Sequence, residues 1–172
     1  MDVREGYKQT SLGAFPQDWI ETLIGSADPI MTSGSRGWAK FYAAQGNTFV
    51  QITNMSRESI ALDLTDPCFV KLPTSKHEGE RTQLAVGDLL VSITADIGIV
   101  SYVDDSLPLP AYINQHVALI RFQSNAVESK FVAYFLARGP GQRTYRATTD
   151  QGAKARINLP TLRAVPIVVP PE

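Results

Sequence analysis

The sequence predicts an α+β fold, a β-rich domain with a twisted, mostly antiparallel sheet and a few peripheral helices. Runs of β-branched and aromatic residues have the length and composition of strands at 49–53, 88–93, 97–103 and 116–122. One segment repeats apolar residues at helical spacing, and proline and glycine are spread as turn residues. With 172 residues, of which 44% are hydrophobic, the chain is expected to form one domain over 1–172.

The N-terminal part is predicted to turn into a short helical start at Asp18, with Trp19 as an anchor. Further along, the strands 88–93 and 97–103 are separated by the turn residues 94–96. Two strands joined by so short a polar turn favour a β-hairpin.

The helical segment has recognisable ends. Asn125 is a candidate N-cap, and Glu128 three residues later would complete a capping box. The apolar residues of 131–136 form its buried side, and Gly139 with Pro140 is expected to end it. At the C-terminus, the prolines of 165–171 predict an extended edge segment.

The formal net charge of −1 conceals an uneven distribution. Residues 1–120 carry eight basic and fourteen acidic side chains, whereas 121–163 carry eight basic ones against Glu128 and Asp150. The eight are Arg121, Lys130, Arg138, Arg143, Arg146, Lys154, Arg156 and Arg163. Such a basic region is typical of a polyanion site, although a solvated helix surface has the same composition.

Residue patterns for catalysis are weak. The sequence has no phosphate-binding glycine loop and no zinc motif. His77 and His116 are far apart in sequence, so structural roles are expected for them. Glu128 and Lys130 resemble half of a metal-dependent nuclease core, but they stand at a helix start and not on a strand. Cys68 is expected to be a buried, inert thiol.

The lack of a recognisable targeting signal in the sequence favours the cytoplasm. The first ten residues are charged and polar and do not form a signal peptide. No apolar run approaches the length of a membrane span, and a single cysteine suits a reducing compartment.

The loop 34–42 carries the side chains of a nucleic-acid contact. Arg36 can pair with guanine O6 and N7, Lys40 can neutralise a phosphate, and Ser35 stands beside them. The aromatic residues of the loop either stack on bases or anchor the loop in the core. They are Trp38, Phe41 and Tyr42.

Two further polar segments are candidate contacts. Asn114 and Gln115 precede a strong strand, and their amides can read adenine N6 and N7, although turn chemistry would also explain them. The segment 148–156 can contact phosphates through Lys154 and Arg156, or it can be a mobile solvated loop.

Six segments, in order, resemble the target-recognition domain of the specificity subunit of type I restriction–modification enzymes. The most distinctive are GDLLVSITADIG at 87–98 and INQHVALIR at 113–121. The others are 6–19, 30–42, 49–55 and 157–171, so that the similarity covers essentially the whole chain.

The resemblance implies a non-catalytic domain that reads one half of a bipartite sequence in double-stranded DNA. A full specificity subunit has two such domains joined by long helices, and we expect the helical spacer and the second domain to be absent from this chain. The chain would need no cofactor of its own. A methyltransferase subunit would bind S-adenosylmethionine and flip the target adenine, and a restriction (motor) subunit would use ATP and Mg²⁺.

Two other classes of function remain open at this point. The chain can be an interaction module, such as an antirestriction decoy that binds the methyltransferase subunit without DNA. It can also be a metal-dependent nuclease, on the strength of the residues at 128–130.

Overall fold

The computed structural model describes residues 3–73, 77–149 and 156–171, and its centre is a four-stranded antiparallel sheet. The strands follow the order β4 (Ile30–Ser33), β11 (Val117–Arg121), β8 (Leu89–Ser92) and β9 (Val100–Tyr102). Strands β8 and β9 pair as consecutive antiparallel neighbours, which confirms the predicted hairpin, but β9 begins at Val100 and not at residue 97, so the connection is longer than the predicted turn 94–96. The predicted strand at 116–122 is confirmed as β11, the strand that joins β4 to β8.

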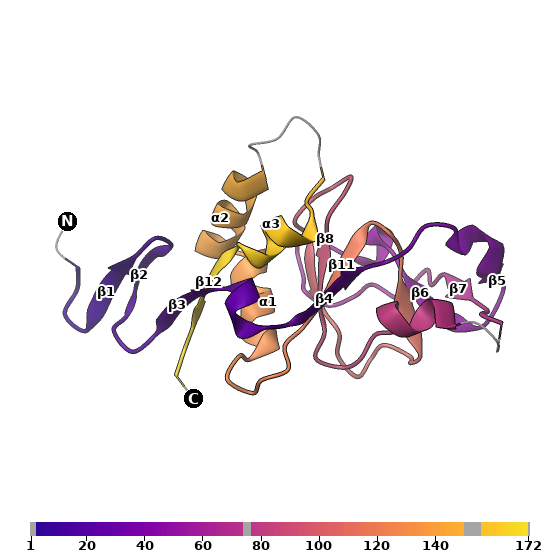
Figure 1. Cartoon of the computed structure of the whole chain (residues 1–172), viewed down its shortest axis with the longest axis horizontal. Helices are drawn as coiled ribbons and strands as arrows, with labels where there is room; N and C mark the ends of the chain where they lie inside the picture. The colour runs from indigo at the N-terminus through magenta and orange to yellow at the C-terminus, as the bar shows by residue number, and fades with distance from the viewer. Residues whose placement is uncertain (1–2, 74–76, 150–155, 172) are drawn as a thin grey trace.

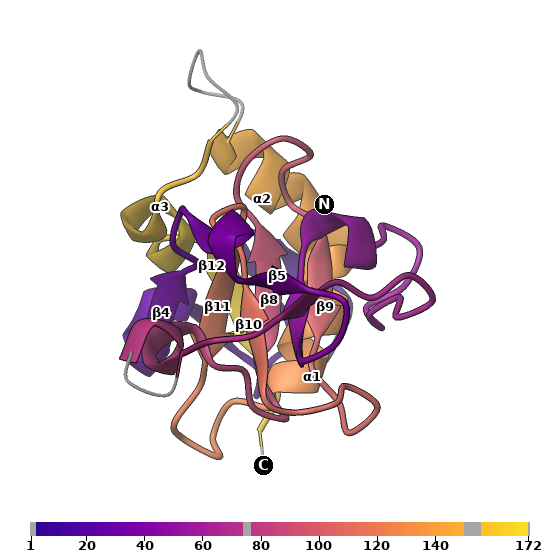
Figure 2. The same cartoon turned by 90° about the vertical axis from the view of Figure 1, so that its right-hand side faces the viewer.

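Both faces of the central sheet are buried, because successive side chains of a strand point to opposite faces. On β11, Ala118 and Ile120 belong to one apolar cluster, whereas Val117 and Leu119 belong to another. The first cluster is covered by helices and by strand β12 (Pro166–Val169). A second sheet covers the other cluster, so the domain is built as a helical layer and two sheets (Figures 1 and 2).

The second sheet places two strand ends side by side. Its order is β10 (Ala111–Ile113), β6 (Asn47–Val50), β7 (Phe69–Val70) and β5 (Tyr42–Ala43). Strand β10 runs parallel to β6, with Ile113 opposite Val50, while the other pairs are antiparallel. Parallel strands finish at the same edge of a sheet, so the residues after β6 and after β10 emerge together. The strand predicted at 49–53 is observed as β6, which ends at Val50 and is followed by a 3₁₀ turn at Ile52–Asn54.

An N-terminal arm extends from this body (Figure 1). It contains the hairpin of β1 (Tyr7–Thr10) and β2 (Gly13–Pro16), followed by β3 (Ile20–Leu23), which pairs with β12. The extended C-terminal segment predicted at 165–171 is confirmed by that pairing.

Trp19 is an anchor, as predicted, but the helical start at Asp18 is wrong. The Trp19 ring lies 5.8 Å from the Phe15 ring and 5.4 Å from the Phe131 ring, between their centroids. The backbone N–H of Trp19 donates to Pro16 O at 3.1 Å, which makes a turn. Strand β3 begins at once because its partner β12 supplies the hydrogen bonds that a helix would otherwise make.

The predicted helix is α1 (Ser129–Ala137), but its cap is Glu128 and not Asn125. The Glu128 carboxylate accepts the N–H groups of Lys130 at 3.0 Å and Phe131 at 2.6 Å. These bonds satisfy donors of the first turn, so no residue further upstream is needed as a cap. Asn125 lies in an exposed turn instead.

Helix α1 ends just before Gly139 and Pro140, as predicted. The same two residues also form the first turn of a second helix, α2 (Gly139–Thr149), which was not predicted. Arg138 is extended and Gly139 has φ of +60°, which breaks the first helix. Proline fits the first turn of a helix, where its missing N–H has no partner to lose. The loop predicted from 148 therefore starts too early, since α2 continues to Thr149.

Short elements complete the described chain. They are the 3₁₀ helices η1 (Ile24–Ala27), η2 (Trp38–Phe41), η3 (Ile52–Asn54) and η4 (His77–Thr82), and the helix α3 (Leu159–Arg163).

Candidate nucleic-acid interface

The loop 34–42 and the segment 114–116 meet at the same end of the sheet. Strand β4 leads into the loop and pairs with β11, with Ser33 opposite Ala118. Gly34 then lies so close to Asn114 that a Cβ at position 34 would be 2.1 Å from the Asn114 carbonyl oxygen. Glycine is therefore required at Gly34 for this approach. The two candidate segments, far apart in sequence, form one surface.

A pocket of about 330 Å³ opens between these segments. Its lining residues come from the loop, from the end of β6 and from the segment after β10. They are Gly37, Trp38, Ala39, Tyr42, Phe49, Gln51, Asn114, Gln115 and His116. We call it the amide pocket, because amide side chains supply much of its polar lining.

The loop's aromatic residues divide between the two roles considered for them. Trp38 and Phe41 are buried, and the Trp38 ring stacks on Phe49 with 4.8 Å between centroids. These two are core anchors. Tyr42 is 51% exposed and borders the amide pocket, so it is available to a ligand.

The predicted contacts of the loop are exposed or half-buried. Arg36 is exposed and makes no hydrogen bond or ion pair within the described part of the chain. The Lys40 ammonium lies 4.9 Å from the centroid of the Phe41 ring. Ser35 is held from below, because Arg81 Nη2 donates to Ser35 Oγ at 2.8 Å.

Arg81 was not identified from the sequence. It also donates to the Ser33 carbonyl at 2.7 Å and hydrogen-bonds the Thr32 hydroxyl, so it fixes the start of the loop to η4. Arg81 therefore positions the loop, because its guanidinium is engaged in contacts within the fold.

Asn114 and Gln115 are half-buried and fixed by the residue that follows them. Asn114 Oδ1 accepts the backbone N–H of His116 at 3.0 Å. The Gln115 amide nitrogen lies 3.2 Å from His116 Nε2. His116 is a structural residue, as expected, because its Nδ1 hydrogen-bonds the Thr94 hydroxyl.

Thr94 extends the surface to the tip of the β8–β9 hairpin and to Arg156. Thr94 and Arg156 form an isolated antiparallel bridge, and Arg156 is exposed. Lys154, the other predicted phosphate contact, lies outside the described residues. We call the combined surface of loop 34–42, segment 114–116, hairpin tip 94–96 and Arg156 the recognition edge.

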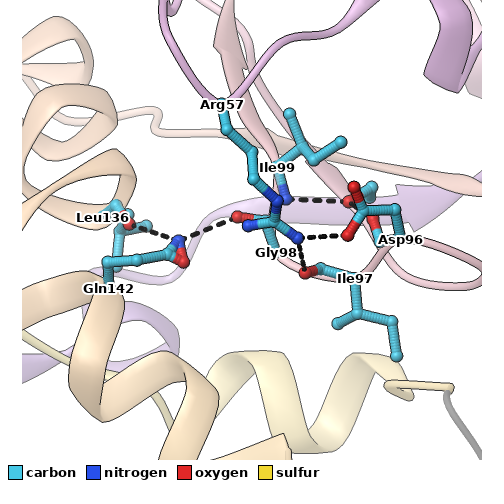
Figure 3. Close-up of polar contacts among 8 residues, drawn as sticks. Arg57, Asp96, Ile97, Gly98, Ile99, Leu136 and Gln142 are labelled. Carbon is cyan, nitrogen blue, oxygen red and sulfur yellow. Dashed lines mark hydrogen bonds and ion pairs between the residues drawn. The ribbon is translucent and has the colours of Figure 1, made fainter.

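The hairpin tip is held from two sides (Figure 3). Arg57 forms an ion pair with Asp96 and donates to the Ile97 carbonyl at 2.8 Å. From α2, Gln142 Nε2 donates to the Gly98 carbonyl at 2.9 Å and to the Leu136 carbonyl at 3.2 Å. Arg57 and Gln142 therefore position the tip, and neither was identified from the sequence.

Gln51 is a further pocket residue that sequence reasoning missed. It follows β6 as Asn114 follows β10, and the parallel pairing of these strands brings the two side chains to one edge. The backbone N–H of Asn114 donates to Val50 O at 3.3 Å across this junction. A polar residue after each of two short strands was visible in the sequence, but the parallel pairing was not.

Several of the eight basic residues counted in the sequence are bound within the fold. Arg121 pairs with the buried Asp88, which raises the pKa of the guanidinium. Arg138 and Arg163 donate to the carbonyls of Glu58 and Pro29. The charge count alone therefore overstates the basic surface.

Other titratable groups are explained by the fold. Cys68 is half-buried and not buried as expected, and this partial burial raises the pKa of its thiol. Burial also raises the pKa of Tyr145, which is 1% exposed. Hydrogen bonds from Ser106 lower the pKa of the exposed-turn carboxyl of Asp104.

The nuclease alternative gains no support from the geometry of Glu128, because its carboxylate caps α1. Among the residues that the structure describes, no three His, Cys, Asp or Glu side chains are grouped to hold a metal ion. Within the same residues, no helix is long and apolar enough to cross a membrane.

Solved structures share this fold. One chain, from a structure of complex assembly and conformational transition of the type I R-M system, has a TM-score of 0.68 and 18% identity, covering 98% of this chain and 38% of that one. The HsdS subunit from Thermoanaerobacter tengcongensis has a TM-score of 0.65 and 19% identity, covering 97% and 37%. The type I restriction-modification S subunit from M. genitalium has a TM-score of 0.55 and 12% identity, covering 87% of this chain and 34% of that one. This chain thus spans little more than a third of each.

Among the curated proteins, no relative matches the chain. The family model for the type I restriction modification DNA specificity domain matches residues 72–172. This match includes Asn114, Gln115 and Arg156, whereas the loop 34–42 precedes it. It covers more than half of the sequence and confirms the resemblance drawn from the motifs. The chain belongs to the family of type I restriction modification DNA specificity domains.

Proposed function

We propose that this chain recognises a specific sequence in double-stranded DNA, as one half-site domain of the specificity subunit of a type I restriction–modification enzyme. The observation that carries the proposal is the recognition edge. Segments from residues 34–42, 94–96 and 114–116 converge there, with Arg36 and Arg156 exposed beside half-buried amides. Cations that contact phosphate or guanine next to amides that contact base edges are the side chains that a major-groove reader uses.

Recognition in this proposal divides between loops and strand ends. Arg36, on the exposed loop, would contact a base or a phosphate, and Lys40 would contact the backbone. Asn114 and Gln115 would read base edges, because their side chains are held in place by His116 and both residues line the pocket. Lys154 and Arg156 would contact phosphates. A single module of this size buries modest surface, so its affinity alone should be modest.

The chain would act without catalysis of its own. We place adenine methylation in a methyltransferase subunit that binds S-adenosylmethionine, and DNA translocation and cleavage in a restriction (motor) subunit that uses ATP and Mg²⁺. The three would assemble on DNA in the cytoplasm.

The proposal is tested by selection of bound duplexes from a random pool, with the wild-type chain and with Arg36→Ala. Loss of a bidentate contact to guanine should cost about 1–3 kcal/mol and relax the preference at one base pair. Arg36→Lys is the matched variant, because it keeps the charge and loses the planar fork. It should retain most of the affinity and lose the preference. An unchanged base preference in Arg36→Ala would remove Arg36 from the set of base contacts.

The other two classes are separated by simple assays. Capture of the methyltransferase subunit by a chain with no affinity for duplex DNA would favour the decoy. Cleavage of plasmid by the purified chain with Mg²⁺ or Mn²⁺ would favour the nuclease.

A further inference from the structure

We propose that the amide pocket reads a guanine in the major groove, through the Asn114 amide and the Tyr42 hydroxyl. This inference rests on the proposed function, because it names the base that one part of the recognition edge takes. The residue type alone assigns adenine to Asn114. The hydrogen bonds around Asn114 assign a different base.

Asn114 lines the pocket, and its amide oxygen is already engaged by the backbone. A bidentate contact to adenine needs the amide oxygen to accept from N6 while the nitrogen donates to N7. Asn114 Oδ1 already accepts the His116 N–H at 3.0 Å, which uses one of its two lone pairs and restricts the directions from which adenine N6 could donate. Its Nδ2 group then carries two N–H donors that have no partner within the described residues. The guanine edge offers O6 and N7, which both accept.

Tyr42 contributes a further donor because of the way Gln51 is oriented. The backbone N–H of Asn54 donates to the Gln51 carbonyl at 3.0 Å, and the Gln51 N–H donates to Asn54 Oδ1 at 2.9 Å, so the backbone of Gln51 is held in a tight turn. Gln51 Nε2 donates to Tyr42 Oη at 3.2 Å. Since the phenol oxygen accepts this bond, its own proton is left to be donated to a ligand. Through this bond Gln51 is a positioning residue for Tyr42.

The rest of the pocket makes the choice of base depend on these neutral donors. None of the described residues that line it is a lysine or an arginine, and the buried residues Trp38 and Phe49 are part of its lining. Neutral hydrogen bonds contribute little to the general attraction for phosphate, which is electrostatic. A change at Asn114 should therefore alter the preferred base more than the overall affinity.

The decisive variant is Asn114→Asp, studied by duplex selection with the full chain. Aspartate keeps an oxygen for the His116 N–H and replaces the outward donor by an acceptor, which suits the N4 amino group of cytosine. We expect the wild type to select guanine at one position. Asn114→Asp should lower the guanine-to-cytosine preference there by about 5- to 150-fold.

Asn158→Asp is the matched control. Asn158 Oδ1 accepts the Thr161 N–H at 2.8 Å at the start of α3, outside the pocket. The control adds the same charge to an amide with the same kind of backbone bond. It should lower affinity for all duplexes slightly and keep the wild-type base preference.

A second measurement does not depend on the aspartate variant folding well. Replacing the selected guanine by 7-deazaguanine removes N7, and the wild type should then bind about tenfold more weakly. Tyr42→Phe, which removes one donor and keeps the ring, should reduce the discrimination between guanine and adenine at that position.

Two results would overturn the proposal: a selected site whose preferences are the same in Asn114→Asp and wild type, or a wild type that selects adenine at the position sensitive to Asn114. Equal affinity of the wild type for every duplex is a different result. It would refute the proposed function itself, and this inference with it.

Discussion

The guanidinium of Arg121 lies as a fork against the carboxylate of Asp88. Arg121 Nε and Nη2 approach the two carboxylate oxygens at 2.6 and 2.7 Å, and Asp88 is fully buried. Asp88 also accepts the backbone N–H of Ala85 at 2.7 Å. This pair explains why an acidic residue stands just before β8 and a basic one ends β11. Both belong to the motifs that carry the family resemblance, yet their observed contacts are within the fold.

Arg121→Ala should destabilise the domain by about 3 kcal/mol, because it leaves the buried Asp88 charge without a partner. The figure is at the lower end for a buried pair, since the Arg121 side chain is 33% exposed. Urea unfolding measures the loss. Arg143→Ala, at an exposed position of α2, is the control and should change the unfolding free energy by less than about 0.5 kcal/mol. Equal losses in both variants would show that the pair does not stabilise the fold.

The surface positions of single residues were predictable where the signal is local, while their contacts with DNA stay a prediction. Arg36 in a glycine-rich loop and Asn114 before a strand could be selected from residue type and position, and the structure places both on the recognition edge. Arg81 and Arg57 could not, because their partners lie 46 and 39 residues away in sequence at Ser35 and Asp96. Residue type alone does not distinguish an arginine that is held by the fold from one that is available to a ligand.

At the scale of elements, the β8–β9 hairpin depends on a close contact with α2. Gly98 has φ of +85°, and a Cβ at that position would be 2.6 Å from the buried ring of Tyr145. Only glycine satisfies both the left-handed backbone and the contact. Gln142, one turn earlier in α2, holds the same segment through its bond to the Gly98 carbonyl.

Gly98→Ala should therefore destabilise the domain by roughly 2–4 kcal/mol, from the left-handed backbone and from overpacking together. Gly87→Ala separates the two causes. Gly87 has φ of +96°, but a Cβ there would meet no atom within 4 Å, so this variant should lose only about 1–2 kcal/mol. Thermal or urea unfolding compares them. If Gly87→Ala were as damaging as Gly98→Ala, the contact with Tyr145 would have no part in stability.

Elements with a strong local signal were predicted well, and those defined by partners were not. The strands β8 and β11 have uninterrupted apolar sequences that stay buried on both faces, so their extents were recognisable. Helix α2 has a polar, glycine-rich sequence, so its packing against α1 and β12 contributes to its stability as a helix. Strand β3 was missed for the same reason, because its partner β12 comes from the far end of the chain.

At the scale of the whole molecule, the net charge of −1 leaves DNA binding to the local arrangement of cations on the recognition edge. The arm with β1 lies at one end of the molecule and β5 at the other (Figure 1). Because the net charge is close to zero, long-range attraction of the whole domain to DNA is small. The dependence of affinity on salt concentration should then reflect few phosphate contacts.

Lys154→Ala should weaken binding to all duplexes alike and reduce the slope of log affinity against log salt concentration by about 0.9. Lys8→Ala, on β1 in the N-terminal arm, is the matched control and should leave the slope unchanged. Titrations at several salt concentrations measure both. An unaltered slope in Lys154→Ala would remove Lys154 from the phosphate contacts.

The register of β4 against β11 sets the distance between two parts of the recognition edge, the loop 34–42 and the segment 114–116. The loop with Arg36 leaves one end of β4, and Asn114 stands just before β11. A strand advances about 3.4 Å per residue, which is also the rise of one base pair in duplex DNA. A two-residue slip would keep each side chain on its own face of the sheet. It would move the loop relative to the pocket by up to about two base pairs, so that one ancestral domain could yield readers of differently spaced bases without a new fold.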